Sequence, residues 1–264
     1  MSVPGLARGI ALLRLFRRDR RMLSPADIAS ELHLPRSTVH RLLGELMELG
    51  LVRRECDGRY VLDSGVLTLG FEYLASNDLV TLSAPLLEGL RDRTNWSTHL
   101  AVRQGQRAVY LSRYPARAAV TRNVVVGTSL PAHATVMGRV LLADLEPAEL
   151  QALYPRGVPA HEGAADDGPP SLAQLQQRIA VDRERGHAAE EGYFESGVVA
   201  IAAPVRDMSL KTVAAINAIH VGAAVEDMAA MTSAVVETAE AISRLLGAPG
   251  RMPALPRALE GEIA

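Results

Sequence analysis

The chain has 264 residues, of which 48% are hydrophobic and 22% are charged, and its formal net charge is −2. This length suits two domains, and the hydrophobic fraction excludes global disorder because it can supply a core. A single cysteine excludes an internal disulfide and a cysteine-based metal cluster. We find no signal-peptide pattern and no apolar stretch near the ~20 residues that span a bilayer. We therefore expect a cytoplasmic protein with no membrane partner.

Charge is unevenly distributed along the chain. Residues 1–62 contain 11 arginines and 7 acidic residues, a net charge of +4, whereas the remaining 202 residues carry −6. A basic segment beside an acidic body predicts that the basic segment contacts a polyanion. A chance fluctuation of surface charge is the alternative.

The first part of the basic segment predicts two helices. Apolar residues recur at helical spacing between Leu6 and Phe16, and an arginine cluster follows them. The stretch Ser24-Pro25-Ala26-Asp27 is typical of a helix N-terminus: Ser24 can cap it, proline suits the first turn, and the Asp27 carboxylate can answer the cap. A second short helix is expected to end at the tight connection His33-Leu34.

The next helix, opened by Pro35, is predicted to have two different faces. Its inward stripe consists of Val39, Leu42, Leu43 and Leu46. Its other face carries cationic and hydroxyl side chains near the helix start. Two helices joined by a short turn, the second with such a face, indicate a helix-turn-helix that enters the major groove of double-stranded DNA. The residues expected to contact DNA here are Arg36, Ser37, Thr38, His40 and Arg41.

A β-hairpin is predicted directly after this helix. Residues 51–54 and 59–62 are two short strands around the turn Asp57-Gly58. In that position the hairpin would be the wing of a winged helix, with Arg54 and Arg59 near backbone phosphates. For each arginine alone, a solvated surface charge is the alternative. The ordered set favours a winged helix-turn-helix domain over residues 1–63.

The rest of the chain indicates an α+β fold with a second, mixed domain. Residues 64–93 predict linker helices interrupted near Asn77-Asp78, and residues 94–250 predict a body of strands and helices. The expected strands cover 97–102, 108–112, 122–126, 198–205 and 212–221. The expected helices cover 132–145, 147–154, 171–186 and 225–246. A long loop is expected over 155–170, and a poorly ordered tail over 251–264.

Motifs of catalysis or of metal and cofactor binding are missing from the sequence. The seven histidines show no H-x-x-x-H or H-E-x-x-H spacing, and there is no glycine-rich phosphate loop or nucleophile elbow. Glu190, Glu191 and Glu195 near His187 could serve as acid and base, but a solvated acidic turn is favoured. We therefore expect no enzyme activity, no metal and no cofactor.

One segment of the body is typical of ligand recognition. Residues 130–135 place a proline and small residues before a helix whose N-terminal dipole suits a small anion. An ordinary strand-to-helix connection is the alternative.

Several stretches of the predicted winged helix-turn-helix domain, which we call the head (residues 1–63), and of the body (residues 94–250) together carry a family resemblance. They are Leu34–Leu43, Leu49–Val52, Tyr60–Leu62, Leu130–Thr135, Gly138–Ala143 and Ile201–Asp207. Through them the chain resembles the IclR family of bacterial transcription regulators over residues 4–247. The resemblance implies a winged-helix head, a linker helix and a GAF-like effector domain, assembled as a homodimer or a dimer of dimers. It also implies binding of operator DNA and of a small-molecule effector, often a carboxylate or an aromatic acid.

The resemblance also implies positions for the effector site. One side would consist of Leu130, Thr135, Val136 and Met137, and the other of Glu190, Ala200, Asn217 and Ile219. The chain departs from the family at Val136-Met137, where small residues are frequent, and at Glu190–Tyr193, where an Asp-Asp-Glu-Glu stretch is common. These departures change the size and polarity of the site, and Met137 and Tyr193 favour an aromatic or bulkier ligand.

We interpret the protein as an effector-responsive DNA-binding regulator and not as an enzyme. Within the site, Thr135 is expected to hold the polar end of the effector, and Asn217 to orient the other end. A structural role for Asn217 in the core or at a subunit contact is the alternative. For the whole protein, the alternatives are an enzyme with a DNA-binding head and a constitutive DNA-binding protein whose body only oligomerises.

Overall fold

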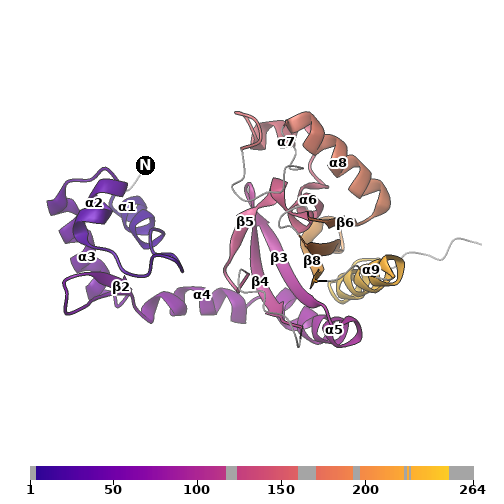
Figure 1. Cartoon of the computed structure of the whole chain (residues 1–264), viewed down its shortest axis with the longest axis horizontal. Helices are drawn as coiled ribbons and strands as arrows, with labels where there is room; N and C mark the ends of the chain where they lie inside the picture. Colours follow the sequence, from indigo (N-terminus) through magenta and orange to yellow (C-terminus); the bar gives the residue numbers. More distant parts are fainter. Residues whose placement is uncertain are drawn as a thin grey trace, which may run out of the picture. The chain divides into compact units, whose positions relative to one another are not determined.

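A computed structural model of the chain describes residues 4–116, 124–159, 171–192, 197–222, 225 and 227–249. The chain divides into two compact units, Met1–Asn77 and Asp78–Ala264. Each unit has its own hydrophobic core and is shown in Figure 1. Within the described ranges, no helix combines the length and the apolar composition that crossing a bilayer requires.

The N-terminal unit is a helical domain with one small hairpin. It consists of α1 (Pro4–Leu13), α2 (Pro25–Glu31), α3 (Arg36–Glu48), β1 (Val52–Arg54), β2 (Tyr60–Leu62) and α4 (Gly65–Ala75). The predicted capping box of α2 is confirmed: Ser24 Oγ accepts from the Asp27 N–H, and the Asp27 carboxylate accepts from the Ser24 N–H at 2.9 Å. The four predicted inward residues of α3 are all buried.

The predicted wing hairpin is also confirmed. Strands β1 and β2 pair antiparallel, with Val52 opposite Leu62, and Gly58 at φ +82° provides the left-handed turn residue between them. Tyr60 pairs in addition with Leu23, so the hairpin is anchored to the segment that precedes α2.

The C-terminal unit is built around one six-stranded antiparallel sheet. Its strands are β3 (Ser97–Gln104), β4 (Arg107–Tyr114), β5 (Ser129–Pro131), β6 (Ala188–Glu191), β7 (Val198–Arg206) and β8 (Thr212–Val221). They follow the order β5-β4-β3-β8-β7-β6 across the sheet. The two long apolar runs predicted as strands are thus adjacent, and β8 lies beside β3 in the middle.

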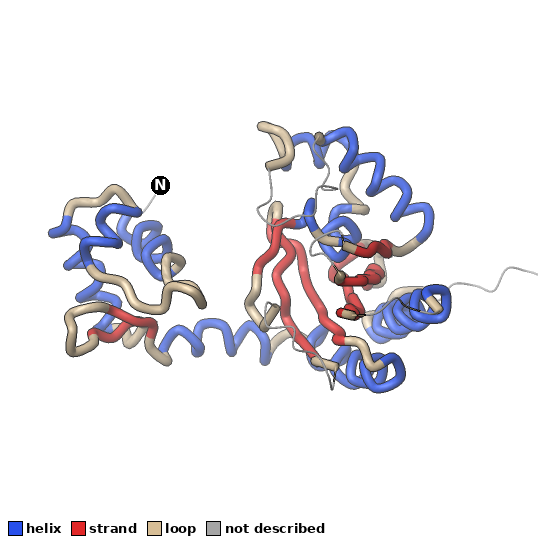
Figure 2. Tube along the Cα trace, in the orientation of Figure 1, coloured by secondary structure: helices blue, strands red, loops and turns tan. Residues whose placement is uncertain are grey.

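Helices cover both faces of this sheet (Figures 1 and 2). One face packs against α6 (Val136–Leu142), which contacts α8 (Leu172–Arg185) behind it. The short helices η1 (Ala132–Ala134) and α7 (Pro147–Leu153) complete that layer. The opposite face packs against α5 (Asp78–Thr94) and α9 (Met228–Leu245). We call the face that contacts α6 the inner face.

Strand register determines which side chains share the inner face. Side chains alternate between the two faces of a strand, and directly opposed residues of adjacent strands point to the same face. Ala101, Ala202 and Ala215 pack with Val136 and Met137 of α6 in one buried cluster. The residues that share the parity of these alanines on each strand therefore point to the inner face. Alanine side chains therefore form much of the inner face where it packs against the short helix α6.

Three sequence predictions for the body are wrong in detail. The residues 124–126 are not a strand, and the edge strand begins at Ser129 instead; 122 and 123 lie outside the described residues. The helix expected over 132–145 is split, because Thr135 takes an extended conformation (φ −132°, ψ 146°) to cap α6. The acidic turn expected at Glu190-Glu191 is strand β6.

Other boundaries differ by a few residues. Helix α9 begins at Met228 because the Asp227 side chain accepts from the Ala230 N–H. The break expected at Asn77-Asp78 separates α4 from α5 and coincides with the boundary between the two units. Most of the predicted 155–170 loop and the whole 251–264 tail lie outside the described residues.

Candidate functional site

The exposed face of α3 carries the polar side chains predicted for DNA contact. Arg36, Ser37, His40 and Arg41 are exposed, and Thr38 is half-buried. The same helix is held in place by its buried stripe, so the polar face is presented by a rigid element. Among the described residues, no carboxylate forms an ion pair with Arg36 or Arg41. Both guanidinium groups are thus available to phosphates or base edges.

The two arginines predicted on the wing differ in their partners. Arg59 donates to Asp57 within the turn at 2.7 Å, and this hydrogen bond lowers the pKa of Asp57. Arg54 has no acidic partner in the described part of the chain. A phosphate would have to replace Asp57 at Arg59 but meets no competitor at Arg54. The structure therefore separates two residues that the sequence could not distinguish.

The sheet register gathers the predicted effector residues of the body on the inner face. Ala200 is opposite both Glu190 and Ile219, and Asn217 is opposite Ala202. Leu130 and Ala200 pack against the buried cluster that contains Val136 and Met137. Residues distant in sequence thus lie close together where the inner face of β6, β7 and β8 packs against α6.

Thr135 marks the start of α6, and its hydroxyl is already engaged. Thr135 Oγ1 accepts from the Gly138 N–H at 3.0 Å, which occupies one of the free N–H groups of the helix start. The side chain is buried. A ligand at this position therefore meets the hydroxyl proton of Thr135 but not the Gly138 N–H.

Asn217 is paired with a histidine that the sequence analysis did not select. His99 of β3 is directly opposite Asn217 of β8, and His99 Nδ1 lies 2.9 Å from Asn217 Oδ1. Burial lowers the pKa of His99 to about 4, against the hydrogen bond with Asn217, and the nearby Arg113 adds to the lowering. The ring also meets the edge of Tyr110 at 5.5 Å between centroids. His99 is therefore a neutral imidazole at physiological pH.

Glu190 belongs to a buried ion network, also missed at the sequence level. Arg139 of α6, 1% exposed, donates to Asp182 of α8 and to Glu190 of β6, each at 2.7 Å. Arg178 adds a contact to the other oxygen of Glu190 at 3.3 Å. Burial opposes the charge of Arg139, but its hydrogen bonds to the two carboxylates outweigh burial and raise its pKa. Both oxygens of Glu190 are thus occupied by arginines.

The missed residues had weak signals in the sequence. His99 lies in a predicted strand that is buried on both faces from Ser97 to Ala101, where a polar ring requires a hydrogen-bond partner. Arg139 lies in an otherwise apolar helix, where a buried cation requires acidic partners. Neither pattern identifies the partner, because Asn217 and Asp182 are 118 and 43 residues away in the chain.

Family models account for most of the chain. The model "Bacterial transcriptional regulator IclR C-terminal" matches residues 71–244, and the model "IclR helix-turn-helix domain" matches residues 5–55. These models describe transcriptional regulators and not enzymes.

Individual relatives are also transcriptional regulators. The Pca regulon regulatory protein of Pseudomonas putida is 33% identical over 224 residues, which cover 83% of this chain and 75% of that protein. A crystal structure of a transcriptional regulator from Rhodococcus sp. RHA1 matches with a TM-score of 0.78 and 32% identity, covering 93% of this chain and 99% of the other. An IclR homolog from Microbacterium hydrocarbonoxydans, crystallised with 4-hydroxybenzoate, matches with a TM-score of 0.77 and 27% identity. The match covers 92% of this chain and 99% of that homolog. The chain belongs to the IclR family of bacterial transcriptional regulators.

Proposed function

We propose that this regulator binds operator DNA through α3 and the wing, and that a small effector bound on the inner face changes its operator affinity. The observation that carries the DNA part is that Arg36 and Arg41 are exposed, and form no ion pair with any described residue, on a helix whose other face is buried. Arginine offers guanine a bidentate hydrogen-bond pair, which supports base reading by this helix.

The effector part rests on the composition of the inner face. Short alanine side chains, Met137 and a few buried polar groups surround the start of α6. A mostly apolar surface with few polar groups is typical of sites for small organic molecules. The IclR homolog from Microbacterium hydrocarbonoxydans was crystallised with 4-hydroxybenzoate, which supports an aromatic acid as the effector class here.

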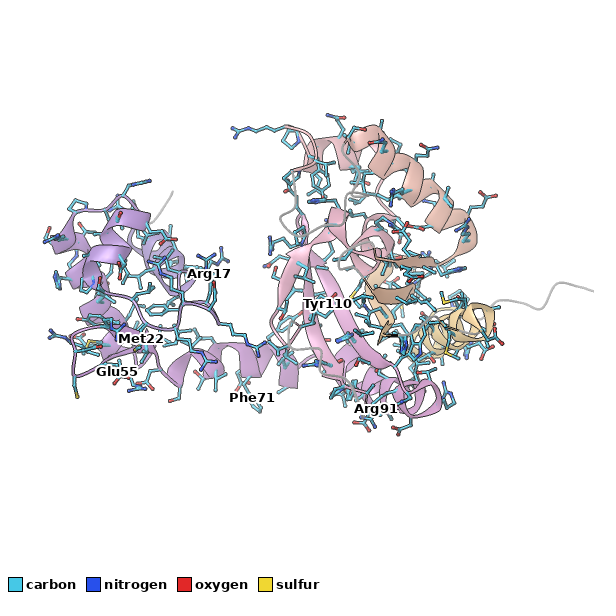
Figure 3. All side chains as sticks on the ribbon, in the orientation of Figure 1. Arg17, Met22, Glu55, Phe71, Arg91 and Tyr110 are labelled. Carbon is cyan, nitrogen blue, oxygen red and sulfur yellow. The ribbon has the colours of Figure 1, made fainter. Side chains whose placement is uncertain are left out.

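We further propose that the functional form is a homodimer or a dimer of dimers. Helix α4 has no buried residue, and Leu67 and Phe71 on it are 75% and 64% exposed. Figure 3 shows Phe71 projecting outward from this helix. An apolar helix left uncovered in one chain is suited to pack against a second copy. Two heads are also what a pair of DNA half-sites requires.

The experiment that tests this function is a DNA-binding titration. Operator fragments are first selected from random DNA with the wild-type protein, and binding is then followed by fluorescence anisotropy. Arg36→Ala or Arg41→Ala is expected to weaken operator binding by about 1–3 kcal/mol, since each removes a base or phosphate contact. Arg156→Ala, at an exposed position of the C-terminal unit, is the control that removes the same charge.

Two outcomes would contradict the proposal. One is operator affinity unchanged in both α3 variants. The other is an affinity in the wild type that no aromatic or aliphatic acid in a metabolite panel alters, which would favour a constitutive DNA-binding protein.

A further inference from the structure

The inner face contains three polar side chains that packing alone does not explain. His99, Asn217 and Tyr110 are each at most 3% exposed, in a surrounding of alanines and α6 side chains. Burying a polar group without a hydrogen-bond partner is costly, so such groups are rare unless they serve a function.

The contact between two of them determines the tautomer of the histidine. Asn217 Oδ1 can only accept, so His99 Nδ1, at 2.9 Å, donates to it. Because the ring is neutral, the other nitrogen, Nε2, has a lone pair and acts as an acceptor. Arg113, opposite His99 in the register, disfavours a second proton on this ring.

The remaining polar atoms of these three side chains have no hydrogen-bond partner in the described part of the chain. Among the described residues, none donates to His99 Nε2, accepts from the Asn217 amide Nδ2, or bonds to the Tyr110 hydroxyl. Tyr110 meets the His99 ring edge-on, and burial raises the pKa of Tyr110, so its hydroxyl keeps its proton. This face therefore offers one fixed acceptor and two donors, with no net charge on the three side chains.

We propose that His99 determines which effector this protein accepts: His99 Nε2 accepts a hydrogen bond from a hydroxyl group of the effector, so that a small, largely apolar hydroxylated molecule is bound in preference to its deoxy counterpart. This rests on the proposed function, since it specifies the ligand class of the same inner-face site. A carboxylate has no proton to donate to Nε2, so that end of a hydroxy acid lies away from His99. Asn217 fixes the ring through Nδ1 and is a positioning residue for the acceptor.

The test uses matched ligand pairs that differ by one hydroxyl group. The probes are 4-hydroxybenzoate with benzoate, and 3-hydroxybutyrate with butyrate, titrated calorimetrically into the full-length wild type, His99→Phe and His220→Phe. His220 is stacked on Trp96 and lies on the opposite sheet face, so its variant is the matched control. In the wild type and the control, the hydroxylated member of at least one pair is expected to bind about tenfold more tightly, a ratio that corresponds to one hydrogen bond. In His99→Phe the two members should bind within about twofold of each other.

A second measurement needs no ligand. In the wild-type chain with nitrogen-15 labelled histidine, NMR is expected to show His99 as a neutral ring protonated on Nδ1, with an unprotonated Nε2. A proton on Nε2 at neutral pH would overturn the inference, even if the His99→Phe variant does not fold.

The ligand arm separates the two proposals. Equal binding of both members of every pair, or no binding of any probe, overturns the hydroxyl assignment. Failure of the proposed function itself would appear separately, as loss of any response of operator affinity across the wider metabolite panel.

Discussion

Buried ionisable side chains are the main features of this protein at the residue scale. His99 is kept neutral by burial, whereas Arg139 is kept charged by two carboxylates. The difference lies in the partners: an amide oxygen stabilises the imidazole weakly, but a carboxylate compensates the desolvation of a guanidinium group directly. Both residues connect the inner face to elements distant in sequence.

The lowered pKa of His99 predicts a pH dependence of stability. The pKa is about 4 in the folded state and 6.5 in the reference state, so below pH 6.5 the unfolded chain binds a proton that the folded chain does not. The contribution of His99 to the free energy of unfolding is thus complete above about pH 6.5 and is lost as the pH falls toward 4. This contribution should decrease by about 2 kcal/mol between pH 7.5 and pH 5. Denaturant unfolding, followed by fluorescence of the single Trp96, measures it.

The variant His99→Phe should lack this component of the pH dependence. The control is His33→Asn, because His33 is exposed and at φ +51°, a conformation that asparagine tolerates. A pH slope in His99→Phe equal to that of the wild type would contradict the assignment.

The ion network predicts a strong asymmetry between its two arginines. Arg139→Met leaves the buried Asp182 and the half-buried Glu190 without their main partner and should cost about 3–5 kcal/mol of unfolding free energy. Arg178→Met removes a partner that is itself one-third exposed and should cost about 1 kcal/mol or less. Denaturant titration of the two variants compares them, and similar costs would show that burial of the network contributes little.

At the scale of elements, the junction between η1 and α6 determines the geometry of the inner face. Gly138 packs so closely on the preceding segment that a Cβ there would overlap the Ala132 backbone. The close approach is what allows Thr135 to turn the chain and cap α6 within one residue. Glycine is needed here for space, since its backbone is helical.

The close packing at this junction predicts that Gly138 does not tolerate alanine, whereas Gly89 of α5 does. Gly138→Ala should destabilise the C-terminal unit by about 1–3 kcal/mol, because backbone must move to admit the methyl group. Gly89→Ala, within α5, should be neutral or stabilising by up to about 1 kcal/mol, since its Cβ would meet only the flexible end of Arg93 at 3.4 Å. Melting temperatures of both variants provide the comparison. A Gly138→Ala variant with an unchanged melting temperature would contradict the close packing of Gly138 against Ala132.

At the scale of the whole molecule, α4 exposes several large apolar side chains and has no buried residue in the described part of the chain. Leu67, Leu69, Phe71 and Tyr73 are all at least half exposed on it. A second chain that covers this helix would remove its apolar surface from water, and each fully buried side chain contributes about 1.5–3 kcal/mol.

Charge introduced on α4 is therefore expected to dissociate the protein. The double variant Leu67→Glu/Phe71→Glu should be a monomer by light scattering. It should lose roughly 10²-fold or more in operator affinity, because a monomer cannot engage two half-sites at once. Thr81→Glu, at an exposed position of α5, is the control for added charge. A double variant with unchanged mass and operator affinity would exclude α4 as the subunit contact.

Local patterns in the sequence determined the head almost completely. The capping box, the two-faced α3 and the Asp-Gly hairpin depend on residues within a few positions of each other, so local sequence is sufficient to predict them. The strands β3, β4, β7 and β8 were equally readable, because their apolar runs and turn residues are continuous in sequence.

Only the tertiary structure decided the inner face. The sequence predicts an acidic turn where Glu190 lies in strand β6, because the charge of Glu190 is neutralised by Arg139, a partner that the local sequence does not show. The break at Thr135 depends on packing of Gly138 against Ala132, and the pairing of His99 with Asn217 depends on sheet register. The pairs His99–Asn217 and Arg139–Glu190 join segments far apart in the chain, whereas the Gly138–Ala132 contact is local but is decided by packing. The sequence of one segment alone does not identify which distant segment will lie beside it.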